Sequence, residues 1–262
     1  MNLNLQNKTA LVCGGSQGLG LATAKELALL GATVIIASRT ESKLIAAVKE
    51  LDTLAGQQHV TLALDLTAPE SAKTIVATWV SKNGSIHILV NNAGGPPSGP
   101  LIDTEATELD KAFSTHVISS HLLVQLLLPG MRQAGYGRII NIVSTAVKQP
   151  INGLGISNTV RAAMANWAKT LANEIGHSGI TVNNILPGYT STERLKYLFA
   201  KQATDQGATI ETIENKIVEN IPAKRLGQPE EFGAVAAFLC TPAASYINGV
   251  NIPVDGGRTG SL

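Results

Sequence analysis

The chain has 262 residues, enough for one large domain or two small ones. Its 20 basic and 19 acidic residues give a formal net charge of +1, and this balance excludes the basic surface of a general nucleic-acid binder. Apolar residues make up 44% of the chain and aromatic residues only 4%. This composition is typical of a compact protein with an aliphatic core and excludes an intrinsically disordered chain.

Neither a secreted nor a membrane-spanning protein is indicated. The two cysteines, Cys13 and Cys240, fit neither a disulfide framework nor paired zinc ligands, and the first fifteen residues lack the pattern of a secretory signal. The most apolar helix-like stretch, Val117–Leu128, is interrupted by His121 and Gln125. It is also shorter than the roughly 20 apolar residues that cross a bilayer. We therefore expect a cytoplasmic protein.

Short apolar runs alternate with longer amphipathic stretches along almost the whole chain. The runs predict strands over Thr9–Cys13, Thr33–Ala37, Val60–Leu64, Ile86–Val90, Arg138–Val143, Thr181–Leu186 and Asn251–Val254. The stretches predict helices over Gly20–Leu30, Glu41–Leu54, Pro69–Ser81, Glu105–Gln133, Ser157–Ile175 and Pro229–Leu239. Most strand candidates are apolar without alternation, which is typical of parallel strands buried on both faces. We expect an α/β fold with a Rossmann-type doubly wound parallel sheet of about seven strands and helices on both faces.

No linker or compositional break divides the chain, so we expect a single domain over residues 1–262. The segment Tyr189–Ala223 departs from the regular rhythm because it is polar, helix-compatible and inserted after a strand. We interpret residues 189–223 as a small helical lid over a site.

The first predicted strand runs into a glycine-rich turn and then into a helix. Glycines in such a turn let the backbone approach a pyrophosphate, and the positive end of the helix favours its charge. The predicted nucleotide-binding residues here are Gly14, Ser16, Gln17, Gly18, Leu19 and Gly20.

The end of the second strand indicates which dinucleotide binds. An acidic residue there would bind the ribose hydroxyls of NAD, but the chain has Ser38 and Arg39. The planar guanidinium of Arg39 suits a 2′-phosphate, so the sequence favours NADPH over NADH. Gln17 supplies no second cation in the glycine loop, which weakens this argument.

Taken together, the motifs resemble those of the short-chain dehydrogenase/reductase family, and most of all its 3-oxoacyl-acyl-carrier-protein reductase-like members. The matching motifs are Gly14-x-x-x-Gly18-x-Gly20, Asp65, Asn91-Asn92-Ala93-Gly94, Asn141-Ile142-Val143-Ser144, Pro187-Gly188, Arg225-Leu226-Gly227-Gln228-Pro229-Glu230 and Val254-Asp255-Gly256-Gly257. They run from the first strand to residue 257. One minor departure is Cys13, where the family has threonine.

The resemblance implies further cofactor contacts. It places Asp65 and Asn91 beside the adenosine half of the cofactor and Gly94 near the nicotinamide ribose. The residues that would border the nicotinamide are Pro187, Gly188, Thr190 and Thr192. Leu66 and Ala93 are also predicted to bind the cofactor. Family members usually assemble through the two long helices, Glu105–Gln133 and Ser157–Ile175. We therefore expect a homo-oligomer, either a dimer or a tetramer.

The catalytic positions depart from the family pattern of asparagine, serine, tyrosine and lysine. Ser144 fits the serine, whereas Ser157 stands at the tyrosine position, Arg161 at the lysine position and His116 at the asparagine position. Ser157 and Arg161 are four residues apart and share one helix face. A serine is a far weaker acid than a tyrosine phenol, and arginine keeps its charge but cannot pass on a proton.

Three interpretations remain open. The first is an NADPH-dependent reduction of a carbonyl-type small molecule, in which the proton comes from water, from His116 or from Tyr189, with Arg161 holding the ribose or stabilising charge on oxygen. For Tyr189, packing within the lid is the favoured role. The second is hydride transfer to a cationic iminium carbon, which Arg161 would oppose. The third is a catalytically inactive NADPH-binding scaffold or sensor.

Other chemistries have little support in the sequence. The five histidines are scattered without metal-ligand spacing, so we expect no metal site. Ser144 lacks the glycine-flanked turn of a serine hydrolase. Lys148 and Arg194 could meet an anionic substrate, but we favour solvated surface cations. The sequence does not identify the substrate.

Overall fold

A single seven-stranded parallel sheet forms the centre of the molecule in the computed structural model, which describes residues 1–261. Its strands are β1 (Thr9–Cys13), β2 (Thr33–Ser38), β3 (Val60–Ala63), β4 (Ile88–Asn91), β5 (Gly137–Ile142), β6 (Ile180–Pro187) and β7 (Asn251–Val254). The spatial order is β3-β2-β1-β4-β5-β6-β7, and every neighbouring pair is parallel. The predicted fold class is confirmed, and each predicted strand end lies within two residues of the observed one.

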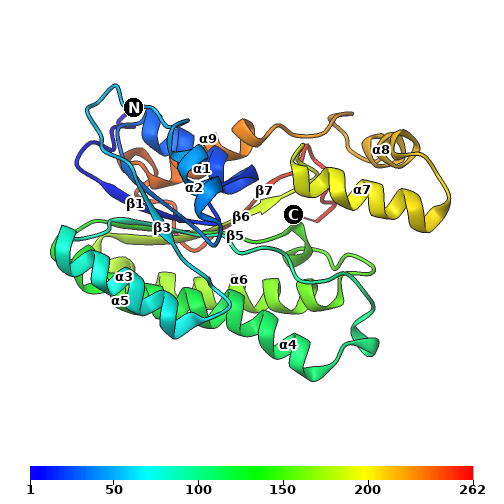
Figure 1. Ribbon diagram of the computed structural model, residues 1–262, viewed down its shortest axis with the longest axis horizontal. Coiled ribbons are helices and arrows are strands. Elements are labelled where there is room, and N and C mark those ends of the chain that lie inside the picture. Colours follow the sequence, from blue (N-terminus) through cyan, green and yellow to red (C-terminus); the bar gives the residue numbers. More distant parts are fainter. Residues whose placement is uncertain (262) are drawn as a thin grey trace.

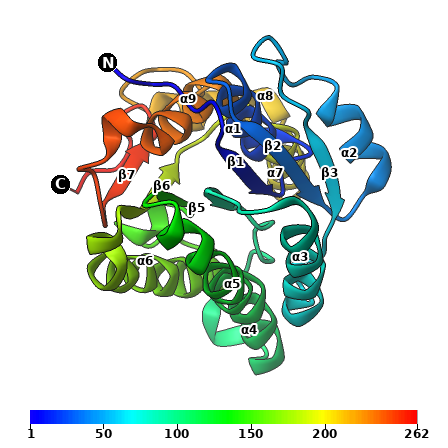
Figure 2. The same ribbon diagram turned by 90° about the vertical axis from the view of Figure 1, so that its left-hand side faces the viewer.

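Helices cover both faces of the sheet (Figures 1 and 2). One face packs against α1 (Gly18–Leu29), α2 (Glu41–Val48) and α9 (Pro229–Cys240). The other face packs against α3 (Pro69–Asn83), α5 (Ser119–Gln133) and α6 (Gly155–Ile175). Short 3₁₀ turns occupy Leu101–Asp103, Thr145–Val147, Gly176–Ser178 and Pro242–Ala244. The continuous apolar strands are therefore buried between two helical layers, as the sequence predicts.

The long helix predicted over Glu105–Gln133 is present as a continuous stretch that contains a π-helical turn. It begins as α4 (Ala106–Phe113), passes through a π-helical turn at Ser114–Ile118 and continues as α5. The Ser119 hydroxyl donates to the Leu66 carbonyl oxygen at 2.6 Å, which ties this turn to the segment after β3. Single π-turns are often found at functional sites, and hydrophobic periodicity alone does not reveal them.

The helix predicted over Glu41–Leu54 is too long, because α2 ends at Val48. The Asp52 carboxylate accepts a hydrogen bond from the Leu54 amide at 2.9 Å, and Gly56 adopts a φ of 80°. An aspartate that bonds to the backbone two residues further on favours a turn over a helix. Asp52–Leu54 therefore forms a turn, although the apolar pattern of the sequence continues to Leu54.

The lid contains two helices, α7 (Glu193–Gln206) and α8 (Ile210–Glu219). They pack on one another through a small cluster that includes Leu195, Phe199 and Ile213. Figure 1 shows both helices projecting beyond the ends of the strands, on the side where the sheet carries its site.

One continuous helical stretch, Ala106–Gln133, is long and apolar enough by length and composition to cross a membrane. However, 44% of its most apolar window is buried against the rest of the protein. The core helix of a globular domain has the same properties, so this stretch is weak evidence for a membrane span.

Candidate cofactor and active site

The strand order reverses beside β1, since β2 lies on one side of it and β4 on the other. Ligands of doubly wound sheets bind at such a point, beyond the carboxyl ends of the strands. A cavity of about 780 Å³ opens there, within the size range of small-molecule sites. It brings together fifteen of the predicted site residues: Gly14, Ser16, Gln17, Gly18, Leu19, Ser38, Arg39, Asp65, Leu66, Ala93, Gly94, His116, Arg161, Pro187 and Thr192.

The glycine loop is shaped by close backbone packing. Gly14 and Gly18 have φ values of 58° and 57°, a region that other residues rarely adopt. A Cβ on Gly20 would lie 2.2 Å from the Gly14 carbonyl oxygen, so no larger residue fits there. α1 begins at Gly18, two residues earlier than predicted, and Gly18 and Leu19 of its first turn line the cavity. The amides of a first helical turn have no partner within the helix.

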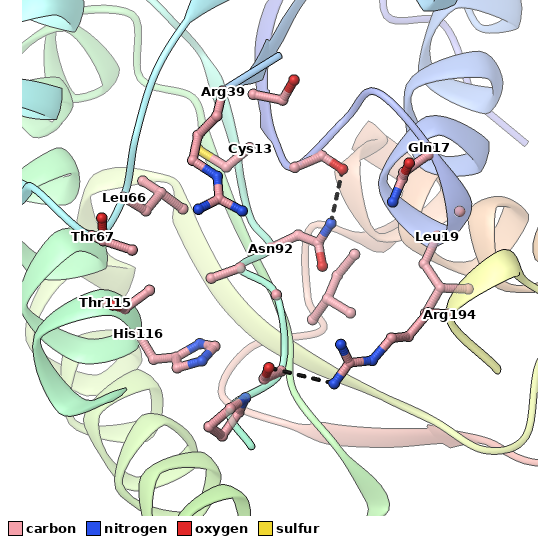
Figure 3. Close-up of a pocket in the computed structure, with 18 of the residues that line it drawn as sticks. Cys13, Gln17, Leu19, Arg39, Leu66, Thr67, Asn92, Thr115, His116 and Arg194 are labelled. Carbon is pink, nitrogen blue, oxygen red and sulfur yellow. Dashed lines mark hydrogen bonds between the residues drawn. The ribbon is translucent and has the colours of Figure 1, made fainter. Parts of the chain in front are cut away.

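Two cations meet at the end of the cavity formed by β2. Arg39 extends over the cavity (Figure 3), as predicted for a group that contacts a 2′-phosphate. The second cation is Lys43 on α2, whose Nζ donates to Gln17 Oε1 at 2.9 Å. Sequence reasoning missed Lys43 because it considered cations in the glycine loop only, although Lys43 follows Arg39 by one helical turn. Beside them, the buried Ser38 Oγ has no hydrogen-bond partner.

The asparagine that reaches the cofactor cavity is Asn92, not Asn91. Asn92 Nδ2 donates to the Gly14 carbonyl oxygen at 3.2 Å and forms part of the cavity wall. The Asn91 amide instead points into the sheet and donates to Asn141 Oδ1 at 2.8 Å. The Asn91 side chain is thus bonded within the sheet, and the prediction that Asn91 flanks the adenosine half stays a prediction.

Three other predicted cofactor residues, Asp65, Gly188 and Thr190, are bonded to other residues of the protein. Asp65 lines the cavity, but its Oδ1 accepts from both the amide and the hydroxyl of Thr67 at 2.9 Å. Gly188 and Thr190 lie outside the cavity wall: the Gly188 amide donates to the Val254 carbonyl oxygen at 2.9 Å, and Thr190 is buried in a bridge to Gly227.

Arg161 lies buried at the inner end of the cavity, with 8% of its surface exposed. Its Nη1 donates to the Ile142 carbonyl oxygen at 2.7 Å and its Nη2 to the Ala93 carbonyl oxygen at 3.4 Å. Arg161 thus links the ends of β4 and β5. Burial lowers its pKa to about 10, so the guanidinium is charged at neutral pH. Its Nε is buried without a partner.

His116 lies on the π-helical turn and faces the same end of the cavity (Figure 3). Burial and the nearby charge of Arg161 lower its pKa to about 3, against a smaller opposing effect of a hydrogen bond with the Gly94 backbone. The imidazole is therefore neutral at physiological pH. This lowered pKa argues against His116 as an imidazolium that donates a proton near neutral pH.

The remaining candidates, Ser144, Ser157 and Tyr189, are not among the residues that line the cavity. Ser144 Oγ accepts from the Ala146 amide at 3.1 Å and so caps a 3₁₀ turn. Ser157 is half-buried in the first turn of α6, one turn before Arg161. Tyr189 packs against Phe199 in the lid, with the Arg258 guanidinium 4.9 Å from its ring centre, and these contacts support the favoured packing role.

The lining suits an extended dinucleotide. Its phosphates would lie near the glycine loop and the cations, and its uncharged rings would lie along the rest of the wall. Within residues 1–261, no three metal-binding side chains come together, so nothing here suggests a metal centre. The Arg161 guanidinium can polarise a substrate, and the predicted hydroxyls belong to Ser144 and Ser157, although neither serine lines the cavity. None of these is an acid with a pKa near neutrality.

Comparisons with known proteins agree with this architecture. Residues 14–259 match a family model described as enoyl-(acyl carrier protein) reductase. A 3-oxoacyl-acyl-carrier-protein reductase of Vibrio cholerae is 34% identical, covering 97% of this chain and 98% of its own length. A 7α-hydroxysteroid dehydrogenase of Escherichia coli is 32% identical, covering 100% of this chain and 98% of its own length.

Solved structures extend the similarity to three dimensions. L-sorbose reductase of Gluconobacter frateurii, in complex with NADPH and L-sorbose, has a TM-score of 0.93 and 32% identity, with all of both chains covered. A 7α-hydroxysteroid dehydrogenase in complex with NADH has a TM-score of 0.87 and 32% identity, covering 98% of this chain and 96% of that one. On the strength of its sequence matches over nearly its whole length, the chain belongs to the short-chain dehydrogenase/reductase family of oxidoreductases.

Proposed function

We propose that this protein is an NADPH-dependent oxidoreductase that reduces a carbonyl-type small molecule. The observation that carries the proposal is the cavity, which joins a glycine loop at one end to a buried arginine at the other. When bound, reduced nicotinamide supplies the hydride, and the residues of the chain bind the cofactor and stabilise charge.

The residues at the adenosine end support NADPH over NADH. Arg39 and Lys43 bring two positive charges to the rim next to Ser38, whose buried hydroxyl has no partner. A 2′-phosphate would accept hydrogen bonds from all three groups, whereas the ribose hydroxyls of NADH lack the matching charge. The glycine loop packs closely against Asn92, which fixes its shape. The amides in the first turn of α1 would bind the pyrophosphate.

At the reacting end, we propose that Arg161 stabilises negative charge on the substrate oxygen and that water supplies the proton. Arg161 uses two of its five N–H groups on backbone carbonyls, so others stay available. Ser157 has a short side chain, which leaves room for water where the family has tyrosine. The buried charge of Arg161 argues against an iminium acceptor.

The second candidate is a nucleotide-binding protein without turnover. It is favoured by one observation: His116 is neutral and Ser144 and Ser157 are weak acids, so a positioned proton donor is missing. Loss of such a donor typically slows a reaction by about 10²–10⁴-fold.

Calorimetric titration with NADPH and NADH, followed by assays on aldehydes, ketones, diketones, quinones and imines, separates the two candidates. Tighter binding of NADPH together with turnover supports the reductase. Binding without turnover, with activity appearing only in the Ser157→Tyr/Arg161→Lys variant, supports the non-catalytic protein. If neither nucleotide binds to folded protein, both candidates are refuted.

We also propose that the protein is a single-domain enzyme of the cytoplasm that assembles as a dimer or tetramer. Size-exclusion chromatography with light scattering tests the assembly.

A further inference from the structure

Arg194 is exposed, as the sequence suggested, but it also forms part of the cavity wall. It stands in the first turn of α7, and its side chain crosses the cavity towards the loop after β4 (Figure 3). There its Nη2 lies 3.5 Å from the Gly95 carbonyl oxygen, at the long limit of a hydrogen bond. This weak bond can be exchanged for a stronger one to an anion.

Gly95 belongs to the loop that joins the glycine-rich end of the cavity to the proposed reacting end. The loop begins at Asn92, which bonds to the glycine loop, and passes His116 near Gly94. It then pairs with the start of α6, where the Gly155 amide donates to the Gly99 carbonyl oxygen at 3.0 Å. Gly95 therefore lies between the nucleotide loop and the helix that carries Ser157 and Arg161.

Carboxylates also line the cavity, at Asp65, Glu108 and Glu193, but none of them is paired with Arg194 or Arg161. Within residues 1–261, no carboxylate lies within 4.0 Å of Arg194 or Arg161. The neighbouring carboxylate of Glu193 is bound instead by Lys196 at 2.8 Å. Arg161 is more than nine-tenths buried, and its Nε has no partner. A buried, charged group without a counter-ion is costly, and an anionic ligand would relieve that cost.

We propose that Arg194 binds the carboxylate of an oxo acid whose carbonyl lies towards Arg161. This inference rests on the proposed reductase function and names its substrate class. The oxo acid takes up a hydride at the carbonyl carbon and a proton from water at the oxygen, and it leaves as a hydroxy acid with oxidation of NADPH to NADP⁺. The N-terminus of α1 would bind the pyrophosphate of the nucleotide, so Arg194 is not needed for that group.

The test compares acids with their uncharged esters. The probes are 2-oxopentanoate, 4-oxopentanoate and 5-oxohexanoate, each against its methyl ester, and the three chain lengths report the distance between carboxylate and carbonyl. The variants are Arg194→Met and Arg194→Lys, with Lys201→Met as a control from an exposed site further along α7. Binding is measured by calorimetry on protein loaded with NADP⁺, and turnover is measured as NADPH oxidation.

A charge-assisted hydrogen bond of this kind is worth about tenfold or more in binding. We expect at least one acid to bind about tenfold more tightly than its ester. Arg194→Met should abolish this difference by raising KM for the acid with little change in kcat. Arg194→Lys should keep part of the difference, and Lys201→Met should match the native protein.

Equal binding of acids and esters, or a preference that survives Arg194→Met, would overturn the inference. So would a loss of NADPH affinity in Arg194→Met, since it would assign the arginine to the pyrophosphate. If acids bind selectively through Arg194 but are never reduced, the proposed reductase function fails while the anion site stands.

Discussion

Three buried asparagines and one partly buried asparagine form a row across strands β4 to β7. Asn91 Nδ2 donates to Asn141 Oδ1 at 2.8 Å, Asn141 Nδ2 to Asn184 Oδ1 at 2.8 Å, and Asn184 Nδ2 to Asn251 Oδ1 at 2.7 Å. The four residues face each other in register on β4, β5, β6 and β7. Asn141 has no exposed surface, so each amide depends on its neighbours for partners.

Replacing Asn141 with leucine should destabilise the protein strongly. The substitution leaves Asn91 Nδ2 and Asn184 Oδ1 without partners, and each orphaned buried group costs about 1–3 kcal/mol. The expected loss is therefore about 2–6 kcal/mol. For a domain of this size, the corresponding fall in Tm is roughly 5–20 °C. Urea denaturation followed by circular dichroism, with a thermal melt, measures both quantities.

Position within the row provides the control. Asn251→Leu leaves only Asn184 Nδ2 without a partner, and Asn251 is half-exposed, so water can replace the lost bond. This variant should lose less than half as much stability as Asn141→Leu. The double variant Asn91→Leu/Asn141→Leu should lose less than the sum of its single variants, because the second change removes a group that the first had orphaned. Equal losses at both positions, or strict additivity, would refute the account.

Three further predictions concern the cofactor end and the reacting end. Lys43→Gln and Arg39→Gln should each weaken NADPH binding by about tenfold with little effect on NADH, which competitive calorimetry would detect. Gly20→Ala should weaken binding of both nucleotides, because its Cβ would sit 2.2 Å from a loop carbonyl; unchanged dissociation constants would contradict this. The pKa of His116 is lowered to about 3 in the folded state, so the unfolded chain binds its proton first, and the free energy of unfolding should fall as pH drops from about 6.5 towards 3. His116→Gln should flatten that part of the curve, and an unchanged slope would show that His116 is not buried as described.

Local sequence patterns predicted the sheet well because each strand is decided by short-range features. The run Thr9–Cys13 is apolar, too short for a helix and followed by glycines, and β1 has those bounds. The glycine loop was equally predictable from the sequence. Only glycine readily adopts the positive φ of Gly14, and only glycine fits the close packing at Gly20.

Features that depend on contacts between distant segments could not be predicted in this way. The π-helical turn at His116 is held in part by Ser119, which bonds to a carbonyl 53 residues away. The shift in the pKa of His116 depends on burial and on Arg161, neither of which its own neighbours in sequence reveal. Likewise, only the packing of α2 against the glycine loop brings Lys43 to Gln17.

Ser157 and Arg161 stand where the resemblance predicts tyrosine and lysine. The geometry of Arg161 suggests that the two replacements depend on each other. A lysine beside a catalytic tyrosine lowers the pKa of the phenol, and that task disappears when serine takes the place of tyrosine. Arginine keeps the positive charge and exchanges no proton, while its planar group can reach two acceptors at once. Here it reaches the Ile142 and Ala93 carbonyl oxygens and holds the ends of β5 and β4 together. A lysine at residue 161 could not make both bonds with the same rigid geometry. On this argument, Arg161→Lys alone should loosen the site without creating a proton donor, and only its combination with Ser157→Tyr should restore one.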